Sequence, residues 1–307
     1  MIIAVFPGQG SQTPGFLAPW LELDGARETL AAFSEQSGVD LIAAGTEWDA
    51  DRIRDTQVAQ PLIVAASLLS WQAFGTQTDT AAIGGIAGHS VGEIPALVAS
   101  GVLSADDGLR LVGIRGRAMA EAAAAEQTGM SAVLGGDEAA VLARLEELDL
   151  TPANYNGGGQ IVAAGALAPL GELATEAPRG TRVIPLQVAG AFHTRYMAPA
   201  VDTLRAAAAD VAASDPTRTL WSNRDGGVVA DGRTALDLLV AQVANPVRWD
   251  LCMASFAEHG VTGIIEFSPA GTLVGLAKRA LRGVPSVAVK TPEDLAAATA
   301  LLTGESA

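Results

Sequence analysis

Short apolar runs alternate with longer amphipathic stretches along most of this chain. The short runs are bounded by glycine or polar residues, as buried strands are, and lie at 2–6, 81–87, 261–266 and 286–289. The longer stretches space their apolar positions as helices do, and lie near 58–74, 93–100, 105–126, 196–213, 250–259 and 272–281. Strands that alternate with helices predict an α/β protein with a largely parallel sheet.

The pattern changes after Gly129, where strands become more closely spaced. Strands are predicted at 130–134, 151–155, 161–164 and 182–186, and helices at 138–148 and 167–175. This βαββαβ order is that of a ferredoxin-like unit. We therefore expect a small inserted domain at 128–190, between the two parts, 1–127 and 191–307, of a larger α/β domain.

Composition narrows the class of protein. The 307 residues are 49% hydrophobic, which is enough for a large core. One cysteine, Cys252, excludes a disulfide framework, and three scattered histidines lack metal-ligand spacing. The chain begins directly in a predicted strand, and the apolar run 62–69 is too short to span a bilayer, so we expect a cytoplasmic protein without a membrane partner. A net charge of −15 argues against a nucleic-acid partner, because phosphates would be repelled.

A serine between two glycines follows the predicted strand at 81–87. The stretch Gly88-His89-Ser90-Val91-Gly92-Glu93 has the G-x-S-x-G spacing of a nucleophile elbow, and a helix is predicted directly after it. In such an elbow the glycines permit a sharp turn that exposes the serine hydroxyl beside free backbone amides. The pentapeptide alone is a weak signal in a chain with 34 glycines, but its position between strand and helix favours Ser90 as a nucleophile.

The serine needs a base, and His193 is the best placed of the three histidines. It lies where the predicted insert ends, in the kind of loop between domains that lines a cleft. His89 adjoins the serine and would be turned away by the elbow, and His259 ends a predicted helix before Gly260, as a C-terminal cap does. A structural role for His193 stays open. No acid follows in hydrolase order, which favours a Ser-His dyad.

Arg115 lies on an apolar helix face. Its helical neighbours Leu111, Ala118, Met119 and Ala122 are all apolar, so the guanidinium needs a partner. That partner is either a buried carboxylate of the protein or the carboxylate of a substrate, held bidentately.

With these residues in view, the chain resembles the malonyl-CoA:acyl carrier protein transacylases, the loading enzymes of fatty acid synthesis, and the related acyltransferase domains of polyketide synthases. The resemblance covers essentially the whole chain and rests on motifs in family order. They are Phe6-Pro7-Gly8-Gln9-Gly10-Ser11-Gln12, Gln60-Pro61, the Ser90 elbow, Arg115-Gly116-Arg117-Ala118-Met119, Asn154-Tyr155-Asn156, Ala191-Phe192-His193-Thr194 and Asn245-Pro246-Val247. It implies a hydrolase-like α/β domain with a ferredoxin-like insert.

The same resemblance implies a role for each matching residue. Ser90 is the acylated nucleophile and His193 its base, while Arg115 clamps the malonyl carboxylate. The further implied roles are an oxyanion hole from the amides of Gln9 and Val91, a histidine-orienting carbonyl at Asn245, and substrate contacts by Phe192, Gln60 and Asn154. One departure is Gly157-Gly158, where many relatives have Ser-Pro.

The implied reaction is ping-pong transfer of malonyl from coenzyme A to the phosphopantetheine thiol of an acyl carrier protein, with no bound cofactor or metal. The alternatives are service to a polyketide synthase, a serine thioesterase or hydrolase, and a non-enzymatic acyl-CoA-binding module. Acyl carrier proteins are acidic, as this chain is, so docking needs a local basic patch. The residues expected to form it are Lys278, Arg279 and Arg182.

Overall fold

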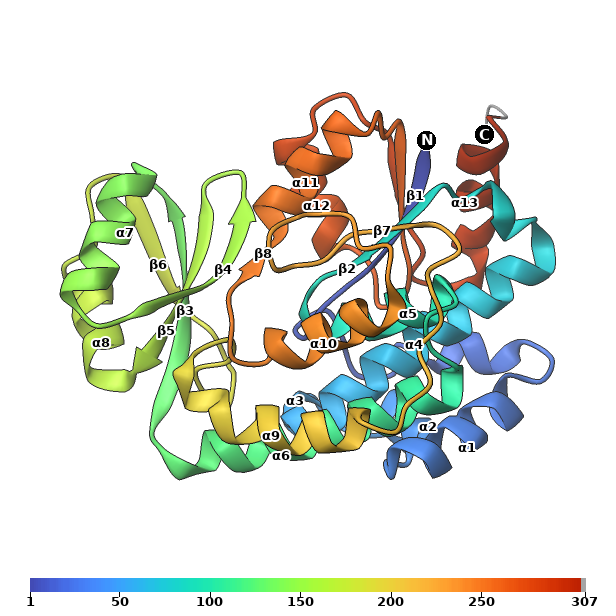
Figure 1. Ribbon diagram of the computed structural model, residues 1–307, viewed down its shortest axis with the longest axis horizontal. Helices are drawn as coiled ribbons and strands as arrows, with labels where there is room; N and C mark the ends of the chain where they lie inside the picture. The colour runs from blue at the N-terminus through green and yellow to red at the C-terminus, as the bar shows by residue number, and fades with distance from the viewer. Residues whose placement is uncertain (305–307) are drawn as a thin grey trace.

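The computed structural model describes residues 1–304, and its central element is a parallel five-stranded sheet (Figure 1). The strand order is β10 (Ser286–Ala288), β9 (Gly263–Glu266), β1 (Ile2–Phe6), β2 (Gly85–Gly88), β7 (Thr219–Leu220). All four pairings are parallel, which confirms the predicted α/β class. The predicted strand 2–6 is found with the same bounds.

Both faces of this sheet are covered by helices, as expected for parallel strands. Along β1, Ile3 and Val5 pack with α11 (Trp249–Glu258) and α12 (Thr272–Ala280), whereas Ala4 and Phe6 belong to the larger core on the opposite face. That core includes helices α1 (Ala26–Ser37), α2 (Leu41–Thr46), α3 (Ala50–Arg54), α4 (Thr56–Gln77), α5 (Glu93–Ala99), α6 (Ala105–Ala125), α9 (Ala198–Ala208), α10 (Gly232–Gln242) and α13 (Leu295–Thr303).

A second five-stranded sheet lies to one side of the first, green in Figure 1. Its order is β6 (Thr181–Pro185), β3 (Thr128–Gly135), β5 (Gln160–Ala166), β4 (Thr151–Gly157), β8 (Val247–Arg248). The first four are antiparallel neighbours in the order of a ferredoxin-like unit. The fifth, β8, pairs parallel with β4 and comes from outside 128–190, so this sheet is not built by the insert alone. The domain boundaries stay a prediction.

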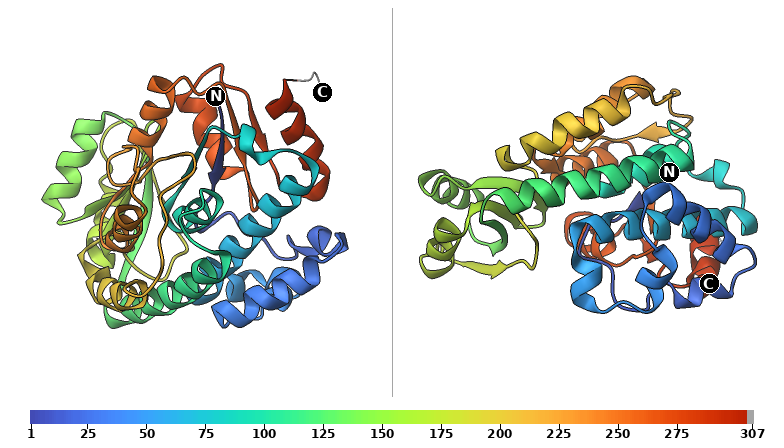
Figure 2. Two further views of the ribbon diagram at one scale, coloured as in Figure 1. Left: turned by 45° about the vertical axis from the view of Figure 1, so that its right-hand side comes forward. Right: turned by 90° about the horizontal axis from the view of Figure 1, so that it is seen from below.

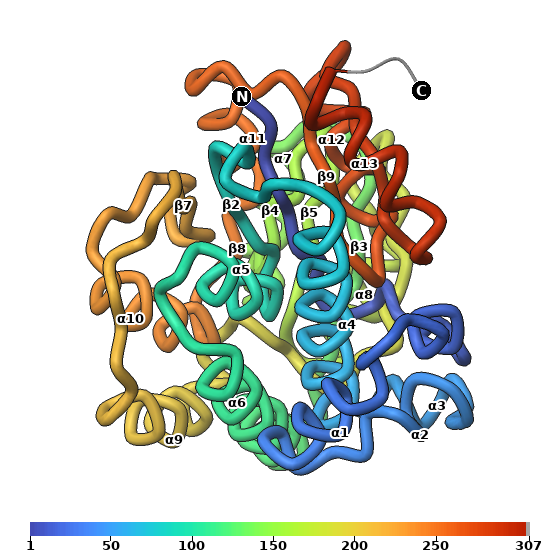
Figure 3. The backbone as a smooth tube through the Cα atoms, turned by 90° about the vertical axis from the view of Figure 1, so that its right-hand side faces the viewer, coloured from blue at the N-terminus to red at the C-terminus, as the bar shows by residue number. Residues whose placement is uncertain are grey.

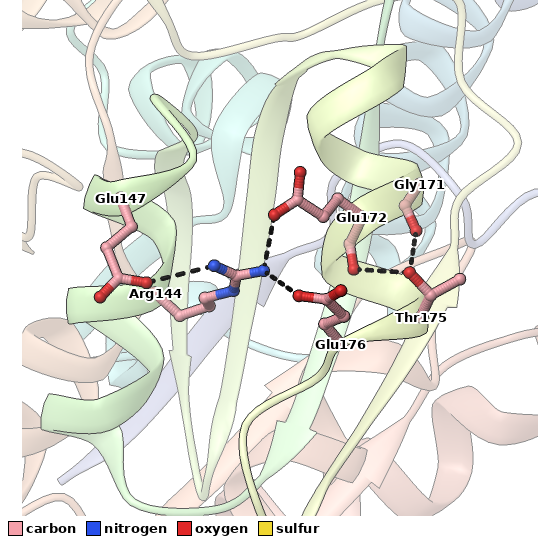
Figure 4. Close-up of polar contacts among 6 residues, drawn as sticks. All are labelled: Arg144, Glu147, Gly171, Glu172, Thr175 and Glu176. Carbon is pink, nitrogen blue, oxygen red and sulfur yellow. Dashed lines mark hydrogen bonds and ion pairs between the residues drawn. The ribbon is translucent and has the colours of Figure 1, made fainter.

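Two helices, α7 (Glu138–Glu147) and α8 (Leu167–Thr175), cover the second sheet and are joined by Arg144 (Figure 4). Its guanidinium donates to Glu147 on its own helix at 3.2 Å and to Glu172 and Glu176 at 2.8 and 3.1 Å. These carboxylates are exposed, so the contacts add little to stability. A buried cluster that includes Val133, Leu145 and Leu173 holds this unit together.

Helix α6 connects the two parts of the molecule and runs beside α9 (Figure 2). In the sequence, the spacing of Ser104 and Asp107 is that of a capping box and predicts the start of this helix. In the structure the Ser104 hydroxyl accepts the Asp107 amide at 3.1 Å, as an N-cap does. Helix α4 is long and apolar enough to span a membrane by length and composition, yet 78% of its most apolar window is buried inside the protein. It is therefore a core helix.

Several helices are absent from the sequence prediction: α1, α2, α3, α10 and α13. Of these, α10 matters most for the site. It begins at a cap in which the Asp231 carboxylate accepts the Thr234 amide at 2.6 Å, and its face with Leu236, Leu239 and Val240 is buried. The cap residue and the apolar face were both present in the sequence. The helix was not predicted because a long loop with little periodicity precedes it.

The close packing of α6 against α1 gives a stability prediction. A methyl group at Gly113 would overlap the Ser37 carbonyl at the end of α1. Gly113→Ala should therefore lower the free energy of unfolding by about 1–3 kcal/mol, measured by urea denaturation. Gly171→Ala, in α8 with no atom within 4 Å, should raise it by roughly 0.4–1 kcal/mol. Equal effects of the two substitutions would contradict the packing argument.

Candidate active site

Ser90 lies in a tight turn between β2 and α5 (Figure 3). Its φ angle of 54° is in the left-handed region, which is costly for a residue with a side chain. The turn needs both flanking glycines, because a methyl at Gly88 would overlap the Gly92 carbonyl and one at Gly92 would overlap the Phe6 carbonyl. The predicted elbow is therefore present, and its close backbone contacts explain its glycines.

The turn is held from outside by Asn223, which follows β7. The Asn223 side chain accepts the Ser90 amide at 2.8 Å and donates to the Gly88 carbonyl at 2.7 Å. Asn223 is fully buried, so these bonds are shielded from water. They stabilise a backbone conformation that Ser90 would not adopt by itself.

His193 lies against the serine. The Ser90 hydroxyl and His193 Nε2 are 2.7 Å apart, and His193 Nδ1 is 2.8 Å from the Gln242 carbonyl. A carbonyl can only accept, so Nδ1 carries the proton and Nε2 is free to accept the serine proton. His193 has a φ of 61°, so both members of the pair have left-handed backbones.

The orienting carbonyl differs from the one expected. Asn245 was predicted to hold the imidazole, but the 2.8 Å bond goes to Gln242, the last residue of α10. The Asn245 carbonyl also raises the pKa of His193, but by less than the Gln242 carbonyl does. The difference arises because α10 ends at this point and directs the carbonyl of its last residue toward His193.

His193 is a neutral imidazole. Burial and, after it, the positive charge of Arg115 lower its pKa to about 3, although the Gln242 carbonyl favours the protonated form. The imidazole is therefore unprotonated at neutral pH. It can accept the serine proton only if the imidazolium is stabilised during the reaction.

Arg115 is 1% exposed and bound by two amides. Nη1 donates to Gln60 Oε1 at 2.6 Å, and Nη2 donates to Gln242 Oε1 at 3.0 Å. Nε is buried and has no partner within the described residues. Burial lowers the Arg115 pKa to about 10, so the group stays charged at neutral pH, partly through the charge of Glu93.

Arg115 forms no ion pair within the part of the chain that is described, so the alternative of a directly paired internal carboxylate fails. The nearest connection runs through Gln242, whose Nε2 donates to Glu93 Oε2 at 2.6 Å. Burial raises the pKa of Glu93 to about 7.

Ser90, His193 and Arg115 line one cavity of about 490 Å³, to which elements of both sheets contribute. Of the predicted site residues, those that line it are Gln9, Gln60, Ser90, Val91, Arg115, Asn154, Phe192, His193 and Arg279. Lys278 and Arg182 are exposed and, like Asn245, are not among its lining residues. Arg279 donates to Gln160 at 3.0 Å, on the insert side of the cavity.

Several site residues were missed or misplaced by the sequence analysis. His89 was expected to turn away from the serine, and its Nε2 lies 2.9 Å from Asn156 Oδ1 while Ser90 is bonded to His193; that His89 also lines the cavity was not foreseen. The supporting polar groups Asn223 and Gln242 lie in segments without a recognised motif. Glu93 ends the elbow motif and could have been noticed as a carboxylate on a predicted buried helix. Residues 1–304 contain no cluster of three His, Cys, Asp or Glu side chains suited to a metal ion.

A parallel α/β domain with a second, ferredoxin-like sheet and a serine at an elbow paired to a histidine defines a serine-dependent acyl-transferring class of protein. The model of the acyl transferase domain family matches residues 3–298, and the chain belongs to this family. It is an acyltransferase.

Named relatives and solved structures are similar to this chain over nearly its whole length. The malonyl CoA-acyl carrier protein transacylase of Mycobacterium tuberculosis is 57% identical over 296 residues, which are 96% of this chain and 98% of that protein. The crystal structure of MCAT from that organism has a TM-score of 0.93 at 56% identity, covering 96% of this chain and 98% of that one. A malonyl-transacylase in complex with a type II PKS acyl-carrier protein has a TM-score of 0.92 at 30% identity, covering 99% of both chains.

Proposed function

We propose that this chain transfers the malonyl group from malonyl-CoA to the phosphopantetheine thiol of an acyl carrier protein, through a malonyl ester on Ser90. The observation that carries this is the position of Arg115: a buried guanidinium with an unpartnered Nε lines the same cavity as the Ser90–His193 pair. The malonyl group has a carboxylate at one end, which would pair with Arg115, and a thioester carbonyl at the other, which Ser90 would attack.

Each half of the reaction uses the same groups. His193 Nε2 takes the Ser90 proton as the hydroxyl oxygen attacks the thioester carbonyl, and the developing oxyanion faces the amides of Gln9 and Val91, which line the cavity. The coenzyme A thiolate then leaves, taking the proton from His193. The carrier thiol repeats the sequence on the malonyl ester, so no cofactor is needed.

Arg115 can select malonyl in two ways. Its free donors offer a charge-assisted pair with the malonyl carboxylate, worth about 1.5–3 kcal/mol. The Arg115 charge is also one of the causes that lower the His193 pKa. A bound carboxylate would offset that charge and so favour the imidazolium that forms as Ser90 attacks.

The other lining residues complete the pocket. Gln60 holds Arg115 at Nη1, and the buried Phe192 limits the space beside His193. Asn154 is buried at the cavity wall on β4. We place the activity in the cytoplasm and in fatty acid synthesis; a polyketide pathway would use the same chemistry. A hydrolase or thioesterase would have no use for the buried cation.

The first prediction concerns the nucleophile. Ser90→Ala should abolish covalent labelling by radiolabelled malonyl-CoA and transfer to carrier protein, because no other group in the turn can form the ester. Ser11→Ala should keep both, since Ser11 bonds the Gly8 carbonyl and does not line the cavity. Circular dichroism checks the fold. A malonyl adduct on the Ser90→Ala protein would refute the assignment.

A second prediction concerns selectivity. Arg115→Ala should reduce kcat/KM for malonyl-CoA by about 10- to 150-fold more than for acetyl-CoA, which has no carboxylate to bind. Arg117→Ala is the matched control: it lies on the same helix, donates to the Ser37 carbonyl and is absent from the cavity lining. Equal losses for both substrates in Arg115→Ala would mean that the arginine is only structural.

The third prediction concerns carrier docking at Lys278, Arg279 and Arg182. The single substitution Lys278→Glu should raise the carrier KM and leave acylation by malonyl-CoA nearly unchanged, because Lys278, unlike Arg279, lies outside the cavity lining and rim charges act on association. Wild-type transfer should also slow with added salt. Arg205→Glu, at an exposed position of α9, makes the same change in net charge as Lys278→Glu and is the control. An unchanged carrier KM would move the docking site elsewhere.

A further inference from the structure

The Glu93 carboxylate lies behind the site and contacts none of the reacting atoms. It is 6% exposed, and both of its oxygens accept hydrogen bonds from donors at 2.6 Å: Oε1 from the Asn223 amide and Oε2 from Gln242 Nε2. No cation lies within ion-pair distance in the described part of the chain. A buried carboxylate without a direct cation is costly, so its retention suggests a role beyond packing.

The hydrogen bonds around Glu93 permit only one set of directions. Arg115 can only donate, so Gln242 must present its oxygen to Arg115 and its amide nitrogen to the other side. That nitrogen faces Glu93 at 2.6 Å and the Ser90 carbonyl at 3.0 Å. A backbone amide can likewise only donate, so Glu93 must accept at both oxygens. A carboxylate meets this requirement and a carboxamide does not.

From this geometry we propose that Glu93 is a positioning residue for acyl transfer: its carboxylate fixes the orientation of the Gln242 side chain and thereby links the Arg115 guanidinium to the Ser90 turn. This inference rests on the proposed function. Gln242 is the point of connection, because its side chain bonds Arg115, Glu93 and the Ser90 carbonyl while its own carbonyl holds His193. Glu93 also fixes the Asn223 backbone, whose side chain holds the Ser90 amide.

A carboxamide at position 93 would break the network. In Glu93→Gln, an oxygen kept toward the Asn223 amide would place the new NH2 against Gln242 Nε2, so two donors would face each other. Turning the Gln242 amide around would place its NH2 against Arg115 instead. In the first arrangement the Gln242 NH2 keeps the Ser90 carbonyl and Asn223 Oδ1 as acceptors, and the NH2 of residue 93 is the donor that faces another donor. In the second arrangement that donor is the Arg115 guanidinium, and either mismatch costs about as much as a lost charged hydrogen bond.

Protonation of Glu93 would act in the same direction, which gives a pH test. Burial raises the pKa of Glu93 to about 7, opposed first by the Asn223 amide and then by the charge of Arg115. The groups around it are Arg115 from α6, Cys252 from α11, and the neutral Ser222, Asn223 and Gln242. Arg115 has a pKa of about 10, burial raises the pKa of Cys252, and burial lowers the pKa values of His193 and His89. A transition near pH 7 that is present in the wild type and absent from Glu93→Gln is therefore assigned to Glu93.

The experiment measures the second-order rate of Ser90 acylation at low malonyl-CoA between pH 6 and 8.5, by rapid quench and intact-protein mass. The wild-type rate should rise about tenfold with pH, since the carboxylate form is the competent one. Glu93→Gln should be about 10- to 100-fold slower at pH 8 and flat across the range. Glu93→Asp, which keeps the charge with a shorter reach, should be slower yet still rise with pH.

The matched control is Glu266→Gln. Glu266 is also fully buried, but it accepts the amides of Gly271, Leu273 and Val274 and has no bond to the Gln242 network. Its variant should keep the pH-dependent rise even if its melting temperature falls. A flat wild-type profile, or a Glu93→Gln protein with the wild-type rate or the wild-type rise, would overturn the proposal. If Glu93→Gln does not fold, the Glu93→Asp and wild-type profiles decide.

The same profile is also measured with a fluorophosphonate that labels Ser90 without using malonyl-CoA. If malonyl-CoA fails to acylate the wild type, the proposed function is wrong, and the fluorophosphonate profile still tests Glu93. If acylation occurs but the rise is independent of residue 93, only the positioning role is wrong.

Discussion

The rest of this site depends on a buried arginine that has no direct anionic partner among residues 1–304. The Arg115 charge must be offset inside the protein. The side-chain oxygens of Gln60 and Gln242 contact it directly, and the Glu93 carboxylate lies behind Gln242. A direct ion pair would have occupied the donors that a substrate needs. Separation of Arg115 from Glu93 by Gln242 keeps the guanidinium charged and leaves part of it free.

The same separation connects the proposed carboxylate site at Arg115 to the Ser90–His193 pair. Gln242 contacts Arg115 with its side chain and His193 with its carbonyl, so both contacts depend on one residue at the end of α10. This arrangement requires a strained backbone, since Ser90 and His193 both have positive φ angles. Asn223 and the close backbone contacts of the elbow glycines compensate for part of that cost.

The position of the cavity follows from the fold. The elbow lies at the carboxyl end of β2 in the first sheet, and Asn154 and Asn156 reach the cavity from β4 of the second sheet. Strand β8 joins the second sheet to the larger part of the chain, so the walls of the cavity are tied by backbone hydrogen bonds as well as by packing. A pocket between two sheets can take a long thioester molecule and bury its reacting end.

The sequence by itself determined the features that depend on neighbouring residues. The first strand, the Ser104 cap, the glycines of the elbow and the apolar face around Arg115 follow from local sterics and periodicity, and all are found. The elbow spacing, the loop between the predicted domains and the apolar helix face pointed to Ser90, His193 and Arg115, which do line one cavity. Only the tertiary structure decided which carbonyl faces His193 and which groups surround Arg115. Gln242 and Asn223 are more than 100 residues from the elbow in sequence, and no local pattern specifies where α10 ends or how an amide side chain is turned. Those choices are set by which donors and acceptors meet once the core has packed, because a buried polar group must find its partner there.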